Sequence, residues 1–130
     1  DKLTQKLPEV DTAVAALVAD LESEGLLDST LIAIATEFGR TPKINTNTGR
    51  DHHPAAYSSV LIGGGIKGGV VYGETDDKGQ KVKKNKVTPQ DFNATIGSAL
   101  GLPIEKEVFS PSGRPFHIAG KGTPIKDLLL

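Results

Sequence analysis

The chain has 130 residues, of which 15 are Lys or Arg and 16 are Asp or Glu, and it contains no Cys, Met or Trp. This length fits one domain or part of one, and the near-balance of charge argues against nucleic-acid or membrane-surface partners held by bulk charge. The lack of cysteine excludes disulfides and thiolate metal sites, and no stretch is apolar for long enough to cross a membrane.

The N-terminal part of the sequence predicts a helix that leads into a strand. Residues 1–8 are polar and are expected to be loose. Gly25 supplies the left-handed residue that ends many helices, and residues 26–30 form a short turn into the strand. Between these points, apolar residues recur at the spacing of one helix face, at Val10, Val14, Leu17, Val18 and Leu21.

Two mostly apolar runs that do not alternate with polar residues, at 31–35 and 58–62, are typical of buried parallel strands. The helix, the tight loop and the first strand predict the second half of a βαβ unit. The polar segment between the strands includes residues 42–49, which are rich in turn formers and predict a surface loop. We therefore expect an α/β fold with a mainly parallel sheet, flanking helices and a ligand crevice at the carboxyl ends of the strands.

Beyond the second strand, three glycines have the spacing of the dinucleotide fingerprint, Gly63, Gly65 and Gly68. That fingerprint needs a helix N-terminus to meet the pyrophosphate, whereas residues 70–72 predict a short strand. The glycines are therefore expected to serve close backbone packing or a turn. The charged segment 74–86 predicts an exposed hairpin that turns at residues 77–79, or else a solvated loop.

A second helix is predicted to begin at Thr88, the N-cap, with Pro89 in the first turn and Asp91 favouring the helix dipole. It is expected to end at Gly101 and to carry three apolar residues on one face, Phe92, Ile96 and Leu100. The tail from residue 102 is expected to be mostly irregular and to close with one helical turn over residues 124–130. His117 is expected to pack within that tail.

The polar loop contains one group of metal-ligand residues. Asp51, His52 and His53 are consecutive, and Glu37 follows the first strand, so both clusters stand beside predicted strand ends. Carboxylates and imidazoles suit zinc, manganese and similar divalent ions. On an extended segment Asp51 and His53 would face one side and His52 the other. The alternative is that the histidines are surface or capping residues, because a catalytic zinc site usually has three protein ligands.

Arg40 and Arg50 form a second group in the same loop. Each arginine would bind a phosphate or sulfate through paired N–H donors; the alternative is an ion pair with Glu37 or Asp51 that fixes the loop. The hydroxyl of Thr41 is available beside them but has no recognisable activating neighbour. We assign no catalytic residue within this chain.

Three segments carry a resemblance to a known family: EFGRTP at residues 37–42, GRDH at residues 49–52 and GGGIKGGVVYG at residues 63–73. With the rest of the chain from residue 10 onward, they resemble the C-terminal part of the domain of unknown function 1501 family. The resemblance implies secreted, sulfatase-like proteins of the alkaline phosphatase superfamily. It therefore implies a partial α/β/α sandwich, a metal site at the strand ends and a periplasmic or secreted location.

The resemblance also implies roles for individual residues. Glu37 stands where the superfamily has a metal-binding Asp, and Phe38 stands where it has a His, so one carboxylate is kept and one imidazole is lost. His52 matches a later metal-binding His, with Asp51 as a further ligand or its neighbour. His53 replaces a large aromatic residue. The implied cofactor is a divalent metal, which is zinc, manganese or calcium.

The superfamily takes its nucleophile and its first metal-binding carboxylates from an N-terminal part that this chain lacks. The chain also contains no Met, so we expect it to have been cut from a longer one or processed. Residues 1–130 would then be the C-terminal portion of one sulfatase-like domain.

We consider three functions. The first is a fragment of a metal-dependent phosphate- or sulfate-ester hydrolase-like protein, incomplete as a catalyst alone. The second is a non-catalytic sulfatase-like scaffold that binds a glycan or a partner protein. The possible ligand of the chain is an anionic ester or a sulfated glycan. The third is a bare α/β piece without activity. We expect neither nucleic-acid binding nor membrane insertion, and we expect a homodimer because a shortened sheet exposes an edge or an apolar face.

Overall fold

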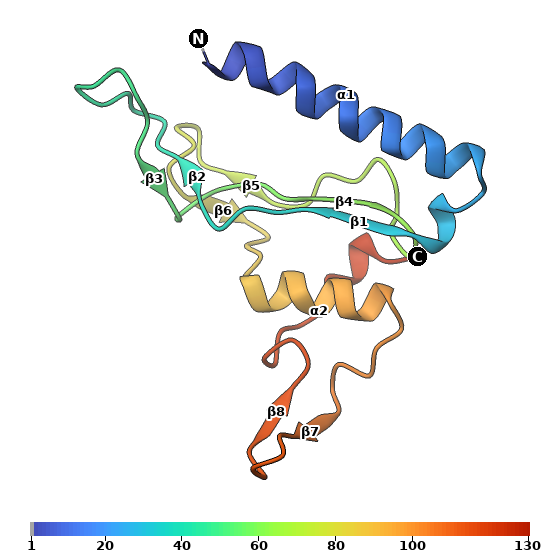
Figure 1. The fold of residues 1–130 in the computed structure, drawn as a ribbon. Helices are drawn as coiled ribbons and strands as arrows, with labels where there is room; N and C mark the ends of the chain where they lie inside the picture. Colours follow the sequence, from blue (N-terminus) through green and yellow to red (C-terminus); the bar gives the residue numbers. More distant parts are fainter. Residues whose placement is uncertain (1) are drawn as a thin grey trace.

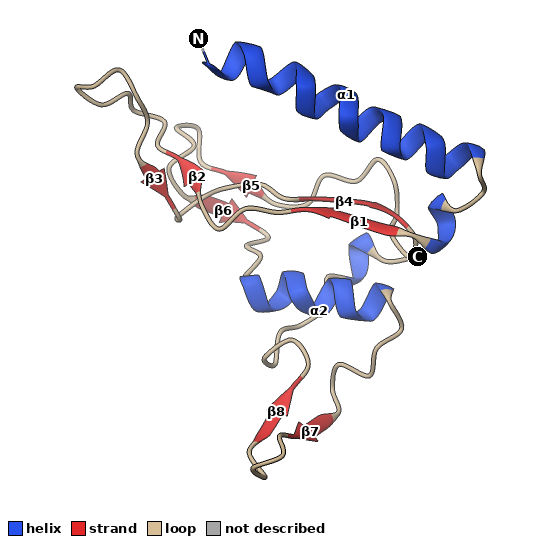
Figure 2. Cartoon of the chain, in the orientation of Figure 1, coloured by secondary structure: helices blue, strands red, loops and turns tan. Residues whose placement is uncertain are grey.

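A computed structural model describes residues 2–130 (Figures 1 and 2). Two helices, several short strand pairs and two 3-10 turns follow one another along the chain. In order they are α1 (Lys2–Ser23), η1 (Leu27–Ser29), β1 (Leu31–Ile34), β2 (Gly39–Arg40), β3 (His52–His53), β4 (Val60–Gly63), β5 (Glu74–Thr75), β6 (Val82–Lys84), α2 (Pro89–Ala99), β7 (Glu107–Phe109), β8 (Pro115–His117) and η2 (Lys126–Leu128).

Helix α1 begins earlier than the sequence pattern predicts. The expectation of a loose segment is wrong for residues 2–8, which form the first turns of the helix with Pro8 inside it, while Asp1 lies outside the described residues. The predicted end is confirmed. Gly25 has φ +67°, its N–H donates to the Glu22 carbonyl at 3.0 Å, and the Leu26 N–H donates to the Leu21 carbonyl at 2.8 Å. This pair of hydrogen bonds is the Schellman arrangement.

Helix α1 runs alongside the β1–β4 ribbon (Figure 1) and covers it only in part. Val14 and Val18 on its apolar face are half-buried. Val10 and Leu17 on the same face stay 57% and 46% exposed, and Ile34 on β1 stays 40% exposed. The amphipathic pattern is therefore present, but the described chain offers too little apolar surface to cover it.

The mainly parallel sheet of a partial α/β/α sandwich, expected above, is wrong. β1 and β4 pair antiparallel from Leu31↔Gly63 to Ile34↔Val60, and the three other strand pairs are also two-stranded and antiparallel. A parallel pair needs a long crossover, usually a helix, whereas the segment between β1 and β4 folds back as the β2–β3 hairpin. Continuous apolar residues indicate burial on both faces of a strand, and they carry no information on strand direction.

Other parts of the chain also differ from the predicted strand positions. The predicted strand at residues 70–72 is wrong, since the backbone there is irregular and the strand begins at Glu74. The hairpin of segment 74–86 is confirmed as β5–β6, with turn residues at 77–79. The tail is more ordered than expected because β7 and β8 form a hairpin, and its last helical turn is confirmed as η2. His117, half-buried in β8, faces Glu107 in the register.

The start of α2 is confirmed in detail. The Thr88 hydroxyl accepts a hydrogen bond from the Asp91 N–H at 3.2 Å, and the Asp91 carboxylate accepts one from the Thr88 N–H at 3.0 Å. This reciprocal pair is a capping box. The predicted apolar face is only partly covered: Phe92 and Ile96 are half-buried and Leu100 is 58% exposed. The buried residues of the helix are Ala94, Thr95 and Gly97.

Asp91 and Thr95 also hold the C-terminal tail against α2. The second carboxylate oxygen of Asp91 accepts a hydrogen bond from the Thr123 N–H at 2.9 Å. The Thr95 hydroxyl donates to the Asp91 carbonyl at 2.7 Å and accepts from the Ile125 N–H at 3.0 Å. Thr95 is fully buried and Ile125 is 8% exposed, so these bonds lie at the centre of the small core.

Of the three glycines in the motif, Gly63 at the end of β4 and Gly65 serve close backbone approach and Gly68 lies in a turn, in line with the predicted packing or turn role. Gly63 has φ +90°, and a Cβ there would lie 2.2 Å from the Thr30 carbonyl oxygen. A Cβ on Gly65 would lie 3.0 Å from the Ala99 carbonyl oxygen, which shows that α2 passes directly beside this turn. No helix begins within the glycine motif, in agreement with the expectation that it is not a nucleotide fingerprint.

The core of the described part of the chain is small. Its buried apolar residues are Ala94 and Ile125, and the exposed surface is 9707 Å². A compact monomer of 13.6 kDa exposes about 6,600 Å². The two-stranded ribbon and α1 therefore present much apolar surface to solvent. No helix within the described residues has the length and apolarity needed to span a membrane.

We expect Gly63→Ala to lower the free energy of unfolding by more than about 2 kcal/mol, because the new methyl group meets the Thr30 carbonyl at a left-handed backbone position. Urea unfolding monitored by circular dichroism measures the change. Gly68→Ala is the matched control, since a Cβ there meets nothing within 4 Å and the backbone is not left-handed. Equal stability of the two variants would contradict the close approach.

We expect the stability conferred by Asp91 to disappear in acid. Hydrogen bonds from the Thr88 hydroxyl and the Thr123 N–H hold the pKa of Asp91 below its usual value of 3.8. As pH falls, the Asp91 carboxylate is therefore protonated at a higher pH in the unfolded chain than in the folded chain. The contribution of Asp91 to the free energy of unfolding is complete above its pKa in the unfolded chain, and it is lost as pH falls through its pKa in the folded chain. The difference in melting temperature between the wild type and Asp91→Asn should begin to shrink as pH falls toward the unfolded value of 3.8 and should continue to shrink below it. A difference independent of pH would refute this.

Candidate functional site

The candidate site residues lie on and around the β2–β3 hairpin. In its register Gly39 faces His53 and Arg40 faces His52, so residues ten or more positions apart meet across two short strands. Figure 1 shows the hairpin beyond one end of the β1–β4 ribbon, next to β5 and β6. The ribbon thus places the hairpin, and the site does not lie in a crevice at the ends of parallel strands.

Thr41 closes the base of the hairpin loop. Its N–H donates to the Asp51 carbonyl at 3.0 Å, and its hydroxyl accepts from the Asp51 N–H at 3.0 Å. The same hydroxyl donates to the Lys43 carbonyl at 2.9 Å. The O–H donor of this hydroxyl and one of its two acceptor lone pairs are therefore used by the loop backbone. Thr41 is therefore a positioning residue in this arrangement.

Asn45 organises the tip of the loop, and the sequence analysis missed it. Its side-chain oxygen accepts hydrogen bonds from the N–H groups of Asn47 and Gly49, both at 3.0 Å. Its side-chain nitrogen donates to a carboxylate oxygen of Asp51 at 2.8 Å. The signal was present in the sequence, since an Asn at the head of a turn-rich segment often bonds the backbone two residues on.

The two arginines brace the hairpin crosswise. Nη1 of Arg40 donates to the Arg50 carbonyl at 3.2 Å, and Nη1 of Arg50 donates to the carbonyls of Thr41, at 2.7 Å, and Pro42. The ion pairs within the described residues are Lys6–Glu9 and Lys84–Glu74, and neither involves these arginines. Both arginines are exposed. The structure thus offers two loop-fixed guanidinium groups that have no carboxylate partner among residues 2–130.

The His52 ring stacks on Phe38. Their ring centroids are 3.8 Å apart and their planes are inclined by 22°. The guanidinium carbon of Arg40 lies 5.6 Å from the Phe38 ring centroid, within the range of a cation–π contact. The Phe38 ring therefore contacts both the His52 imidazole and the Arg40 guanidinium. Phe38 directly follows Glu37 in the chain.

The predicted metal ligands come together only in part. Glu37 lies exposed in a bend before β2, and the Asp51 carboxylate is turned toward Asn45. His53 points to the neighbouring hairpin, where its Nε2 lies 2.9 Å from the Gln80 carbonyl oxygen. Residues 2–130 contain no group of three or more His, Cys, Asp or Glu side chains placed to hold a metal ion. The described residues therefore do not fit a complete metal site by themselves.

Comparison with known proteins decides the family. Residues 1–129 match the family model described as "Protein of unknown function (DUF1501)". The chain belongs to the DUF1501 family. This confirms the family named from the residues of the hairpin and the glycine turn. No curated protein matches the chain, and no solved structure matches it.

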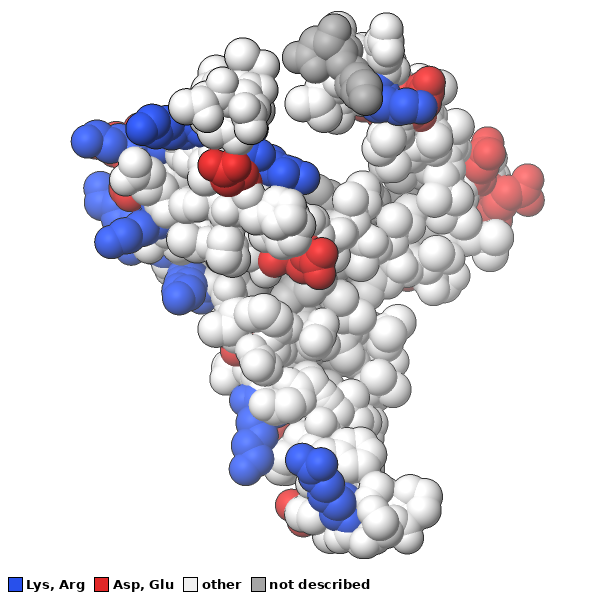
Figure 3. Space-filling view, turned by 60° about the vertical axis from the view of Figure 1, so that its left-hand side comes forward, with Lys and Arg blue, Asp and Glu red and all other residues white. Residues whose placement is uncertain are grey.

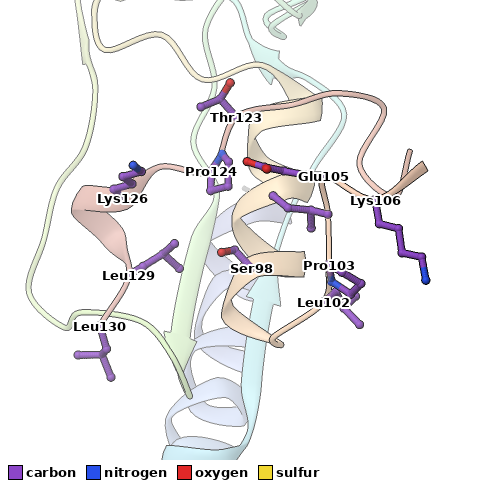
Figure 4. Close-up of a pocket in the computed structure, with 11 residues that line it drawn as sticks. Ser98, Leu102, Pro103, Glu105, Lys106, Thr123, Pro124, Lys126, Leu129 and Leu130 are labelled. Carbon is purple, nitrogen blue, oxygen red and sulfur yellow. The ribbon is translucent and has the colours of Figure 1, made fainter. Parts of the chain in front are cut away.

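A hollow in this DUF1501 chain lies away from the hairpin. It has a volume of about 820 Å³ and lies between the C-terminal end of α2 and the tail (Figure 4). Leu102, Pro103 and Leu129 contribute apolar walls, and Lys126 stands at the edge. None of the site residues predicted from the sequence lines this hollow. The candidate site of the DUF1501 chain is thus an exposed hairpin surface and not a pocket.

Proposed function

We propose that the β2–β3 hairpin binds the anionic group of a phosphate or sulfate ester, and that the chain acts as a non-catalytic binding scaffold. The observation that supports this is the state of Arg40 and Arg50, which are braced by backbone carbonyls and pair with no carboxylate among the described side chains. A guanidinium has five N–H donors in a planar fork that matches an oxyanion. Only Nη1 of each arginine is used within the hairpin.

The bracing also favours binding on entropic grounds. A long side chain that is ordered only when the ligand arrives reduces the affinity, because its rotamer freedom is lost at that moment. The crosswise hydrogen bonds and the Arg40–Phe38 contact hold these side chains before any anion is present. Thr41 and Asn45 hold the loop backbone that supplies the bracing carbonyls.

We expect Arg40→Gln and Arg50→Gln each to weaken the binding of inorganic phosphate and sulfate by about tenfold, since each removes charge-assisted hydrogen bonds. Titration of the chain with either anion, followed by amide chemical shifts, measures the affinity. Arg50→Lys should also bind more weakly than the wild type, because a lysine keeps the charge and loses the fork.

The matched control is Arg114→Gln, which removes an exposed arginine just before β8, away from the hairpin. It should leave the affinity unchanged, and circular dichroism of each variant should match the wild type. Equal weakening by Arg114→Gln would show that the anion responds to overall charge. Unchanged binding by both hairpin variants would overturn the proposed function.

A second candidate function is metal-dependent hydrolysis of such an ester, as in sulfatase-like proteins of the alkaline phosphatase superfamily. It is favoured by the stacking of the His52 imidazole on Phe38, because Phe38 is next to Glu37 in the chain. A bound divalent ion would polarise the ester and activate a water molecule. Glu37, His52 and Asp51 would supply part of its ligand set, and the remaining ligands would come from outside the described residues. A periplasmic or secreted location belongs to the same proposal.

If this second function holds, zinc or manganese should bind to the wild type, and His52→Ala should abolish that binding, because it removes the only imidazole proposed as a main ligand. Calorimetric titration with each metal measures this. His117→Ala is the control, since His117 lies in β8 and outside the hairpin. Metal binding that survives His52→Ala would contradict a metal site at His52. No binding by the wild type would show that the partial ligand set does not hold a metal on its own.

A further inference from the structure

The β5–β6 hairpin is rich in lysine and lies next to the candidate site. Residues 78–86 contain five lysines in nine positions. All five are exposed, and Lys84 alone among them forms an ion pair within the described residues, with Glu74 at 2.8 Å. We call residues 74–86, which form the β5–β6 hairpin, the lysine hairpin. Its lysines are Lys78, Lys81, Lys83, Lys84 and Lys86. From its sequence this segment is expected to be an exposed hairpin or a solvated loop, with no binding role.

Two contacts join the lysine hairpin to the β2–β3 hairpin. The Nε2 atom of His53 lies 2.9 Å from the Gln80 carbonyl oxygen, between Lys78 and Lys81 in the chain. Pro42 also lies against the turn, since a Cβ placed on Gly79 would be 3.6 Å from its Cγ atom. The two hairpins are far apart in sequence, and these contacts make them neighbours in space.

Charge is distributed unevenly as a result. Segments 37–53 and 74–86 together contain eight Lys or Arg and five Asp or Glu, whereas the rest of the chain contains seven Lys or Arg and eleven Asp or Glu. Figure 3 turns the side with these hairpins toward the viewer, and blue side chains gather over it. The near-neutral total therefore conceals a basic surface on one side of the molecule.

Several of the acidic groups on this side are already engaged. Glu74 pairs with Lys84, and Asp51 accepts a hydrogen bond from Asn45. Asp76 accepts hydrogen bonds from the N–H groups of Gln80, at 2.8 Å, and Lys78, at 3.1 Å, which shape the turn. Lys84 offsets the charge of Glu74, whereas Asp51 and Asp76 keep their charge but are held against their own loops. The eight basic residues of the two segments still outnumber their five acidic residues. The remaining lysines face solvent.

We propose that the two hairpins form one continuous surface for a linear sulfated polysaccharide. Arg40 and Arg50 bind one sulfate group at one end, and the lysine hairpin contacts further sulfates along the polymer. This inference rests on the proposed function, because it takes the same oxyanion chemistry and extends it along a chain of repeated anionic groups. Lysine ammonium groups suit this role, since flexible point charges follow a polyanion without demanding one geometry.

The residue types favour a polysaccharide over a nucleic acid. Proteins that bind single strands stack the bases on aromatic side chains, and such stacking supplies a large part of the affinity. Residues 74–86 contain no Phe, Tyr, Trp or His. On the neighbouring hairpin, the Phe38 and His52 rings already stack on each other. A sulfated polysaccharide needs only charge and hydrogen-bond donors, and the surface supplies these.

The test compares a heparin dodecasaccharide with inorganic phosphate on the full chain. Replacing Lys78, Lys81 and Lys83 together by Gln should weaken dodecasaccharide binding about tenfold or more and lower the slope of log affinity against log salt by about 2. The same variant should bind phosphate as the wild type does. The control replaces three other exposed lysines, Lys67, Lys106 and Lys126, and so removes the same charge elsewhere.

Each outcome separates the two proposals. Dodecasaccharide binding that falls only in the lysine-hairpin variant supports the inference, and an equal fall in the control variant overturns it, whether or not phosphate still binds at the arginines. Lysine-dependent dodecasaccharide binding without any phosphate binding overturns the proposed function alone. Single-stranded DNA of similar charge that binds as tightly as the dodecasaccharide, with the same lysine dependence, overturns the assignment to a polysaccharide.

Discussion

The polar contacts of Asp91 and Thr95 hold this structure together more than any apolar cluster does. Asp91 closes the capping box of α2 and accepts a hydrogen bond from Thr123, and the buried Thr95 hydroxyl connects the helix to Ile125. With two buried apolar residues in the described chain, directional hydrogen bonds carry much of the tertiary order. Unmade bonds of buried groups are costly, so these partners favour one position of the tail on α2.

Antiparallel hairpins are the second organising feature, and two of them carry the proposed binding surface. The β2–β3 hairpin presents Arg40, Arg50 and His52 on an exposed protrusion, and the β5–β6 hairpin adds lysines beside it. An exposed surface suits recognition of an extended anionic ligand, whereas hydrolysis needs an enclosed set of reacting groups. The geometry therefore supports binding first and the metal-dependent reaction second.

The large exposed surface bears on partners as well. Val10 and Leu17 on α1 and Ile34 on β1 remain exposed, and the β1–β4 ribbon has an unpaired edge on each side among the described strands. Uncovered strand edges and apolar faces are the features from which we expected a homodimer, and the homodimer stays a prediction. The basic hairpins lie at one end of this ribbon (Figure 1), so a partner on the apolar face would leave them accessible.

Local signals in the sequence determined the helix start at Thr88, the glycine helix ends at Gly25 and Gly101 and the turn of the β5–β6 hairpin, because each depends on contacts within a few residues. The motifs of the hairpin and the glycine turn were also enough to name the family. The direction of β1 against β4, the role of Asn45 and the meeting of His53 with Gln80 were decided only by the tertiary structure. These depend on which distant segments pair, and an apolar run or a charged run has the same pattern whatever its partner is.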